Sequence, residues 1–265
     1  MRNLSCIIIP GCTRKIEGMA LRIMYPETTE IRGLDYWQNP SGTTIAIDPL
    51  RFLYVPDYAE HMMVSWLAKR VFDYQREHLA SGGAITKMVM ITMGALLPGV
   101  LLHDCITYGA ASDLPAIEFG TFGVRFYQGP GQPLSTPQVI QPLSIDVRGH
   151  IVGIIEDLAD MGKTARYVRS VLIEQHGAKE TILIAPYRKS ASVLDDLTTL
   201  TFGVVPQDTW VITPRERVET MMKRVPFWAA RGASAGDCQR YLREIGYPEY
   251  LIDAWFDEAW ARVTP

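Results

Sequence analysis

The chain has 265 residues, of which 48% are hydrophobic and 21% charged, with a formal net charge of −3. This length suffices for one α/β core with additions and does not require two domains, and the weak acidity gives no reason to expect nucleic acid or a membrane surface as a partner. No apolar run reaches the roughly 18 residues of a membrane span, and the four cysteines have no CxxC spacing, so we expect reduced thiols in a cytoplasmic protein.

The first part of the chain is rich in short apolar runs and turns. Residues 1–56 include the runs 7–9 and 43–47, separated by Pro-Gly, Asn-Pro and Ser-Gly pairs, and this pattern predicts an N-terminal extension of β-hairpins. A helix is expected over residues 57–79, because apolar side chains recur there along one stripe. The Ser-Gly-Gly sequence at 81–83 ends this helix.

Strands and helices alternate through the middle of the chain. Strands separated by helices imply an α/β fold with a mostly parallel sheet, flanked by helices and joined by right-handed crossovers. Ligands of such sheets bind beyond the carboxyl ends of the strands. A long polar stretch, residues 128–146, follows the second expected strand. The expected strands are residues 87–92, 117–126, 151–156 and 181–185, and the expected helices are residues 98–108 and 164–176.

The end of the chain predicts short helices. Residues 213–216 (Thr-Pro-Arg-Glu) have the pattern of a capping box with proline at the first helical position, and the helix should end near Arg224. Residues 237–263 predict two further helices, broken by Gly-Tyr-Pro at 246–248. A small helical appendage is therefore expected. The predicted division of the chain is an extension (1–56), a core (57–224) and an appendage (225–265).

The most informative stretch is residues 152–164 (VGIIEDLADMGKT). A buried strand runs into the adjacent carboxylates of Glu156 and Asp157, and Asp160 and a glycine turn precede the next helix. Such a turn presents backbone N–H groups and the hydroxyl of Thr164 at a helix N-terminus, an arrangement that binds phosphate. Three carboxylates beside a phosphate site indicate a ligand with both phosphate and sugar hydroxyls, together with a divalent metal.

Residues 156–164 resemble the ribose-phosphate loop of type I phosphoribosyltransferases. The glycine spacings of a Walker loop and of a Rossmann turn are both absent. The resemblance implies that Glu156 and Asp157, as catalytic residues, hold the ribose hydroxyls of phosphoribosyl diphosphate and the Mg²⁺ associated with them, partly through the ligand and water. Adjacent carboxylates repel one another without a cation or hydroxyl donors nearby, and magnesium diphosphate supplies that cation.

The rest of this loop is expected to bind the 5′-phosphate and the base. The resemblance implies that Met161, Gly162, Lys163 and Thr164 surround the phosphate, although Met161 replaces a hydroxyl residue of the family. In members that use 6-oxopurines, the acid at the position of Asp160 faces N7 of the base, where it would act as a general base or acid. An N-cap of the following helix is the alternative role of this aspartate, and the two roles are compatible.

A second segment, residues 205–211 (VPQDTWV), resembles the base-binding segment of xanthine–guanine phosphoribosyltransferases. The resemblance implies that Trp210 stacks on the purine and that the backbone carbonyl of Val211 accepts from an exocyclic amine. Lys189 stands where the family has a lysine that binds O6, with Arg188 as the alternative. Equally, Trp210 could be a core residue and Lys189 a solvated charge at a strand end.

Two more segments match less fully. Residues 91–99 (ITMGALLPG) resemble the family's pyrophosphate loop, so the amides around Met93 and Gly94 would bind diphosphate oxygens. Relatives carry arginine or lysine at the position of Met93, and its loss removes a charge-assisted contact. Residues 128–141 correspond to a flexible loop that closes over the reacting centre, with Tyr127 at its base. An ordinary surface loop is the alternative.

The sequence therefore predicts a magnesium-dependent phosphoribosyltransferase. It would transfer the ribose 5-phosphate of phosphoribosyl diphosphate to N9 of a 6-oxopurine base and release pyrophosphate. Two alternatives stay open: a regulatory or non-catalytic homologue that binds phosphoribosyl diphosphate, and a transferase for an unusual acceptor. The preferred base stays open as well. Relatives are often dimers or tetramers, so a homo-oligomer is expected.

Overall fold

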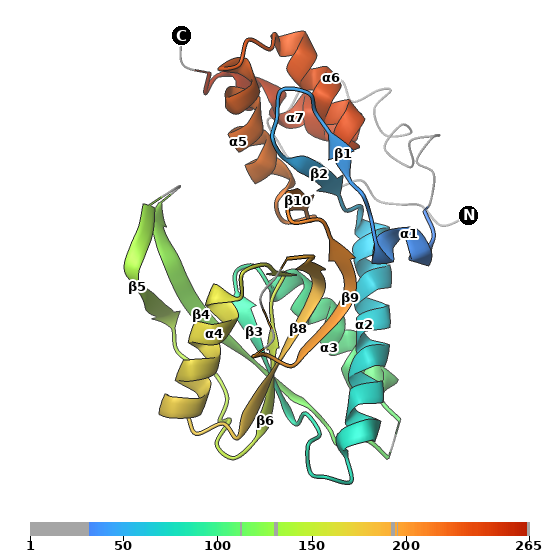
Figure 1. The fold of residues 1–265 in the computed structure, drawn as a ribbon, viewed down its shortest axis with the longest axis vertical. Coiled ribbons are helices and arrows are strands. Elements are labelled where there is room, and N and C mark those ends of the chain that lie inside the picture. Colours follow the sequence, from blue (N-terminus) through green and yellow to red (C-terminus); the bar gives the residue numbers. More distant parts are fainter. Residues whose placement is uncertain (1–31, 112, 130–131, 192–193, 195, 264–265) are drawn as a thin grey trace, which may run out of the picture.

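The computed structural model describes residues 32–111, 113–129, 132–191, 194 and 196–263. Within these residues a seven-stranded sheet forms the centre of the lower part of the molecule (Figure 1). Its order is β5-β4-β3-β6-β8-β7, with β9 also paired to β8, and every pair is parallel except β4 with β5. The mostly parallel α/β sheet is thus confirmed. The strands are β3 (Lys87–Thr92), β4 (Glu118–Gly129), β5 (Gln132–Gln141), β6 (Ile151–Ile155), β7 (Leu158–Ala159), β8 (Glu180–Lys189) and β9 (Thr199–Val205).

The central strands are apolar because helices cover both faces of the sheet. Every residue of β6 is buried, as are the four central residues of β3. Parallel strands buried on both faces have continuous rather than alternating apolar runs, and this explains the sequence IVGII. Gly153 leaves the room that a neighbouring side chain needs, since a Cβ there would lie 2.8 Å from Cδ1 of Ile184.

The helices of the core lie on opposite faces of the sheet because the chain moves away from its centre in two directions. Helix α3 (Leu96–Gly109) connects β3 to β4, whereas α4 (Lys163–Ser170) and a π-helical turn (Val171–Gln175) connect β6 to β8. Right-handed crossovers in opposite directions put α3 and α4 on opposite faces (Figure 1). Helix α2 (Asp57–His78) packs beside α3. The adjacent strands β3 and β6 therefore form a topological switch point, where a crevice opens beyond their carboxyl ends.

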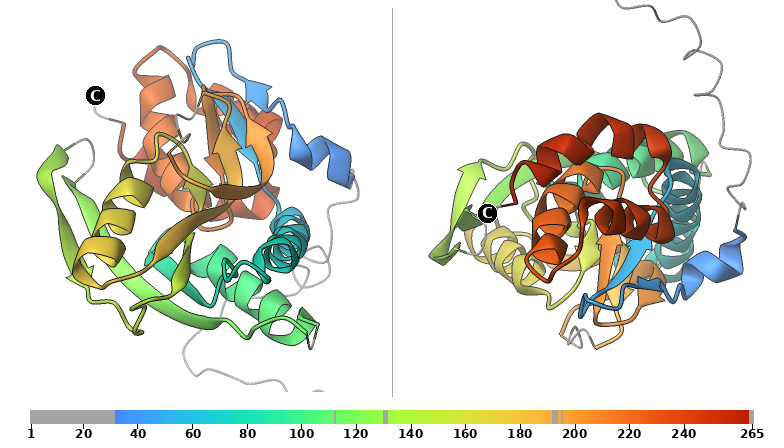
Figure 2. Two further views of the ribbon diagram at one scale, coloured as in Figure 1. Left: turned by 60° about the horizontal axis from the view of Figure 1, so that its bottom comes forward. Right: turned by 90° about the horizontal axis from the view of Figure 1, so that it is seen from above.

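The upper part of the molecule joins segments from both ends of the described chain (Figures 1 and 2). Strands β1 (Thr43–Thr44) and β2 (Arg51–Tyr54) form a small sheet with β10 (Thr209–Ile212), in which β2 and β10 are parallel. Helices α5, α6 and α7 pack on this sheet around a second apolar core that includes Phe52, Ile212 and Trp228. Helix α1 (Leu34–Gln38) precedes β1, and the β-strand expected at residues 7–9 lies outside the described residues. The helices are α5 (Arg217–Ala229), α6 (Ala235–Ile245) and α7 (Glu249–Trp260).

The expectation of a flexible loop at residues 128–141 is wrong for most of that segment. Strands β4 and β5 pair antiparallel and take up residues 118–129 and 132–141, with register shifts along the ladder. Val139 and Ile140 are exposed, as suits a ribbon at the edge of the sheet. A strand that is solvated on both faces does not need the apolar alternation by which strands are recognised, and a polar sequence can therefore form it.

The expected start and end of α5 are also wrong. The helix begins at Arg217, and its N-cap Glu216 makes no side-chain capping bond, so the box at 213–216 is not formed. It continues through Pro226 to Ala229 instead of ending near Arg224. Trp228, in this additional turn, is completely buried, and its packing outweighs the local effect of the proline. The break between α6 and α7 at Gly246 is confirmed.

A buried carboxylate connects the loop between β1 and β2 to α5. Asp48 accepts hydrogen bonds from Nε1 of Trp228 at 2.7 Å, from the backbone N–H of Leu50 at 3.0 Å and from the guanidinium of Arg224. The side chains of Asp48 and Arg224 are both buried, so each charge depends on the other for compensation.

We predict that Asp48→Asn lowers the free energy of unfolding by about 3–5 kcal/mol, because the charge of Arg224 loses its buried partner. Urea denaturation with tryptophan fluorescence measures this change. Asp73→Asn, which removes the exposed ion pair with Arg76, serves as the control and should change stability by less than about 0.5 kcal/mol. Equal small losses in both variants would contradict a structural role for the buried pair.

Candidate functional site

The crevice at the switch point brings the loops after β3 and β6 into direct contact. A Cβ on Gly94 would lie 2.6 Å from Oδ2 of Asp157, so the glycine allows its backbone to approach the carboxylate. Met93, next to it, is 68% exposed. The segments expected to bind diphosphate and ribose are therefore adjacent.

The two adjacent carboxylates have different environments. Burial, followed by the charge of Asp157, raises the pKa of Glu156 to about 8, although a hydrogen bond with the hydroxyl of Thr164 lowers it. Asp157 is instead paired with Arg215, at 2.8 Å between Oδ2 and Nη2. The same nitrogen of Arg215 also donates to Glu216 at 2.7 Å. The pair therefore combines a carboxyl with a raised proton affinity and a carboxylate compensated by arginine.

The loop at 160–164 is held tightly at the N-terminus of α4. Gly162 has a φ of +68° and caps the helix, and a Cβ on it would lie 2.4 Å from Cδ2 of Leu194. Arg166 donates to the carbonyl of Met161 at 2.8 Å and pairs with Asp196 at 2.9 Å. Lys163 and Thr164 form the first turn of α4, whose N–H groups face outward from the helix start. The loop therefore has the geometry of an anion site at a helix N-terminus.

Asp160 and Lys189 are connected through a residue that the sequence did not single out. Nε2 of the Gln207 side chain donates to Oδ1 of Asp160 at 3.1 Å, and Nζ of Lys189 donates to the backbone carbonyl of Gln207 at 3.0 Å. The two expected base-binding side chains thus lie on either side of one glutamine. Gln207 belongs to the recognised run 205–211, so its position in that run was the only signal for it.

Trp210 lies on the other side of β10 from this group. Its indole N–H donates to the hydroxyl of Thr220 at 3.1 Å, and its ring packs with the second apolar core below α5. Val211, the next residue, is buried beside Tyr187 in a different cluster. Side chains alternate along a strand, so the two residues must face opposite ways. The structure does not bring the ring of Trp210 to the crevice. Of Tyr127, it describes only the backbone, in β4.

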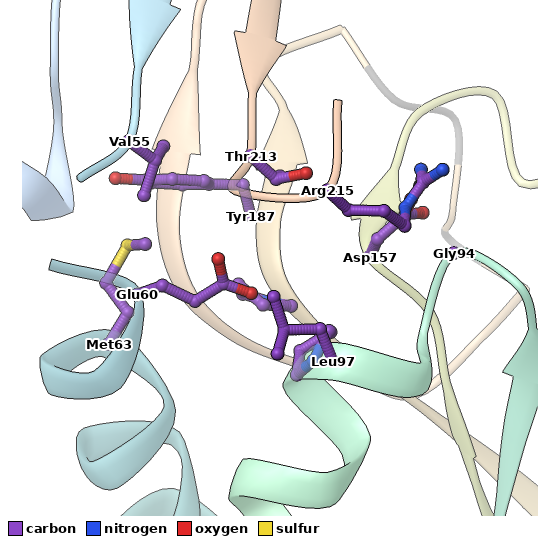
Figure 3. A pocket seen from close by; sticks show the side chains of 11 residues that line it. Val55, Glu60, Met63, Gly94, Leu97, Asp157, Tyr187, Thr213 and Arg215 are labelled. Carbon is purple, nitrogen blue, oxygen red and sulfur yellow. Dashed lines mark hydrogen bonds and ion pairs between the residues drawn. The ribbon is translucent and has the colours of Figure 1, made fainter. Parts of the chain in front are cut away.

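A pocket opens beside Asp157 and Gly94, between the two parts of the molecule (Figure 3). Glu60 of α2 projects into it with only 4% of its residue surface exposed. Glu60 was expected only as part of a helix and Arg215 only as part of a capping box, because neither residue carries a local signal of function. The lining residues are Val55, Glu60, Met63, Gly94, Leu97, Pro98, Asp157, Pro186, Tyr187, Thr213 and Arg215.

The donor set fits magnesium only as a partner of phosphate. Among the described residues no group of three or more His, Cys, Asp or Glu side chains could hold a metal ion alone. Mg²⁺ often binds through one or two carboxylates together with substrate phosphates. Glu156 and Asp157 would supply two such carboxylates to a magnesium ion that arrives with a phosphate-bearing ligand.

Comparison with known proteins identifies the family. A family model described as "Phosphoribosyl transferase domain" matches residues 70–216, more than half of the chain. The chain belongs to this family. The phosphoribosyltransferase domain so matched includes both loops of the crevice, the Asp160–Gln207–Lys189 group and Arg215.

Solved structures similar to this phosphoribosyltransferase chain have low sequence identity. A purine phosphoribosyltransferase from Pyrococcus horikoshii OT3 is similar over 62% of this chain and 92% of its own, at 20% identity and a TM-score of 0.47. A hypothetical protein from Neisseria gonorrhoeae with bound ppGpp is similar over 63% of this chain and 90% of its own, at 16% identity and a TM-score of 0.46. A hypoxanthine phosphoribosyltransferase from Staphylococcus aureus is similar over 55% of this chain and 74% of its own, at 17% identity and a TM-score of 0.43. A search of curated proteins finds no match.

In the part of the chain that the structure describes, no helix combines the length and the apolar character needed to span a bilayer.

We predict that Gly162→Ala destabilises the loop more than its backbone strain alone requires. A non-glycine residue at positive φ costs about 1–2 kcal/mol, and the contact with Leu194 should add about 1–3 kcal/mol. Gly149→Ala is the matched control, because its φ is +73° and no atom lies within 4 Å of the added Cβ. Urea denaturation gives the total loss, and amide exchange over α4 locates it. Equal losses would show that Leu194 moves aside.

We predict that Glu60 makes stability fall as pH rises. Burial raises its pKa from 4.5 to about 7, Asp57 and Asp157 add to this, and Arg217 and Arg215 oppose it. The folded state then holds a proton that the unfolded state releases above pH 4.5, so up to about 3 kcal/mol is lost between pH 4.5 and 7. Glu60→Gln should flatten this part of the curve of unfolding free energy against pH. The exposed Glu77→Gln should leave it unchanged, and an unaltered slope in Glu60→Gln would contradict the shift.

Proposed function

We propose that the protein transfers the ribose 5-phosphate of phosphoribosyl diphosphate to N9 of a 6-oxopurine base and releases pyrophosphate. One observation carries this proposal: three chemically distinct groups meet at the carboxyl edge of one parallel sheet. They are the acidic pair after β6, the helix N-terminus at Gly162, and the chain of hydrogen bonds from Asp160 to Lys189. Family membership supports the same reaction class.

The sugar phosphate would occupy the β6–α4 loop. The N–H groups of Lys163 and Thr164 suit the 5′-phosphate, because the N-terminus of α4 adds its dipole to theirs. Glu156 and Asp157 would accept hydrogen bonds from the ribose hydroxyls. Mg²⁺, bound mainly by the diphosphate and assisted by these carboxylates, would neutralise charge on the leaving group.

The base would be read by the group around Gln207. The ammonium of Lys189 can donate to O6 but cannot accept, so it favours an oxo over an amino group at that position. Asp160 would accept the N7 proton. Gln207 binds both side chains and is the residue that positions them relative to one another.

The chemistry is a substitution at the anomeric carbon. The bond from C1 to the diphosphate oxygen breaks, and its electron pair leaves with pyrophosphate. The base forms the N9–C1 bond and gives its N7 proton to Asp160. Positive charge develops on the ribosyl group during this step, and the carboxylates beside it stabilise that charge.

Arg215 bears on the regulatory alternative. Its ion pair with Asp157 occupies a carboxylate that the ribose would need, and Met93 supplies no positive charge in the facing loop. If Arg215 turns to the diphosphate when ligand binds, it replaces the missing cation.

The test measures pyrophosphate release with magnesium, phosphoribosyl diphosphate and each of guanine, xanthine, hypoxanthine, adenine and orotate. We expect release with 6-oxopurines only. Asp160→Asn should lower the rate about 10²–10⁴-fold, because the N7 proton loses its acceptor. Asp104→Asn, an exposed aspartate on α3, is the control and should have no effect. Binding of phosphoribosyl diphosphate without release from any base would contradict the transferase and favour the regulator.

A further inference from the structure

One oxygen atom of Asp157 lies between the loop after β3 and the arginine that precedes α5. Oδ2 of Asp157 accepts from Nη2 of Arg215 at 2.8 Å, and a Cβ added to Gly94 would lie 2.6 Å from the same Oδ2. Figure 3 shows Arg215 and Asp157 on the side of the pocket where Gly94 lies. A ligand oxygen that replaced this carboxylate oxygen would therefore contact the guanidinium and the loop at Gly94 together.

Arg215 uses only part of its hydrogen-bonding capacity in the ion pair. Its hydrogen bonds to Asp157 and to Glu216 both come from Nη2, and neither Nε nor Nη1 donates to an atom of the described residues. The N–H groups of a guanidinium form a planar fork that matches the oxygens of a phosphate group. Arg215 therefore has free donors for an anionic ligand beside those that hold the two carboxylates.

The positive charge of the pocket comes from this one side chain. Arg215 is the only cation among the 11 described residues that line the pocket. Met93, in the loop expected to bind diphosphate through its amides, is neutral and exposed. A diphosphate at this loop would lie beside the carboxylate of Asp157, and like charges at such a distance repel one another. Arg215 is the side chain placed to offset that repulsion.

The ion pair between Arg215 and Asp157 is of a kind that a ligand can replace. Its side chains are 30% and 25% exposed, and pairs that are open to water contribute little to stability. The pair of Arg224 with Asp48 is different, because its side chains are 9% and 0% exposed. The first pair can therefore open without unfolding the protein, whereas the second supports the fold.

We propose that Arg215 exchanges Asp157 for the diphosphate of the ligand. When phosphoribosyl diphosphate binds, the guanidinium turns to the diphosphate oxygens, and Asp157 becomes free to accept hydrogen bonds from the ribose hydroxyls. This inference rests on the proposed function and adds to it a residue that contacts the leaving group. Arg215 thereby couples the two parts of the ligand, because binding of the diphosphate provides the carboxylate that the ribose needs.

Two fragments of the ligand test this exchange separately. Isothermal calorimetry of the full chain with magnesium measures the dissociation constants of inorganic pyrophosphate and of ribose 5-phosphate. Arg215→Met should weaken pyrophosphate binding about 10- to 100-fold, because charge-assisted hydrogen bonds are lost. The same variant should bind ribose 5-phosphate as tightly as the wild-type protein or up to about fivefold more tightly, because Asp157 is no longer engaged.

Two further variants separate a ligand contact from a structural role. Met93→Arg, added to Arg215→Met, returns a cation to the loop at Gly94, so it should recover most of the affinity for pyrophosphate. Arg70→Met, which removes an exposed arginine of α2, is the control for the lost charge and should change neither dissociation constant. Circular dichroism of each variant verifies that it is folded.

The outcomes distinguish this exchange from the transferase itself. Weaker binding of both fragments to Arg215→Met would show a structural support and overturn the exchange. Unchanged or tighter binding of pyrophosphate would also overturn it, as would failure of the wild-type protein to bind pyrophosphate. None of these results decides whether pyrophosphate is released from phosphoribosyl diphosphate. The expected affinities without such release support the exchange and reject the transferase.

Discussion

The contact between Gly94 and Asp157 is the constraint on which the rest of the crevice depends. This contact exists because β3 and β6 are neighbouring strands and the chain continues from them toward opposite faces of the sheet. The loops that follow must then pass close together before they separate. Only a residue without a side chain permits this distance, since a Cβ on Gly94 would overlap the carboxylate. Two adjoining segments are positioned by this approach: the loop at Gly162 continues from Asp157, and α3 begins just after Gly94.

Charge is distributed unevenly around that contact. Glu156 and Glu60 are carboxyls whose burial raises the pKa, and Asp157 between them is the one with an arginine partner. Buried acids that form no ion pair lower stability, and acids with strongly shifted pKa values occur frequently at functional sites. The two acids have different surroundings. Glu156 lies near the N-terminus of α4, whereas Glu60 lies among the apolar side chains of the pocket. The crevice thus has one polar side, next to a helix N-terminus, and one largely apolar side.

The upper part of the molecule completes the crevice, and the shape of the crevice therefore depends on the stability of that part. Strand β2 brings Val55 to the pocket, and the segment after β10 brings Thr213 and Arg215. These segments are fixed by a core built on Trp228 and Phe52 and by the buried Asp48–Arg224 pair. Trp210 belongs to the same core. The packing of Trp210 in this core attaches β10 to α5. This attachment fixes the direction of the chain after β10, which carries Thr213 and Arg215.

The parallel sheet, its strands β3, β6 and β8, and the glycine turn before α4 could be predicted from the sequence alone, because continuous apolar runs and glycine turns are local signals. Strand β4 was also predicted, as residues 117–126, but strand β5 was not, since residues 138–141 are exposed on both faces of the strand and carry no such signal. Neither could the pairing of Arg215 with Asp157, the position of Gln207 between Asp160 and Lys189, or the projection of Glu60 into the pocket. Each of these joins residues from separate elements. The sequence by itself therefore determined which residues lie at the carboxyl edge of the sheet. Only the tertiary structure decided which of these residues face one another, because their mutual orientation depends on how the helices and the upper part pack against the sheet.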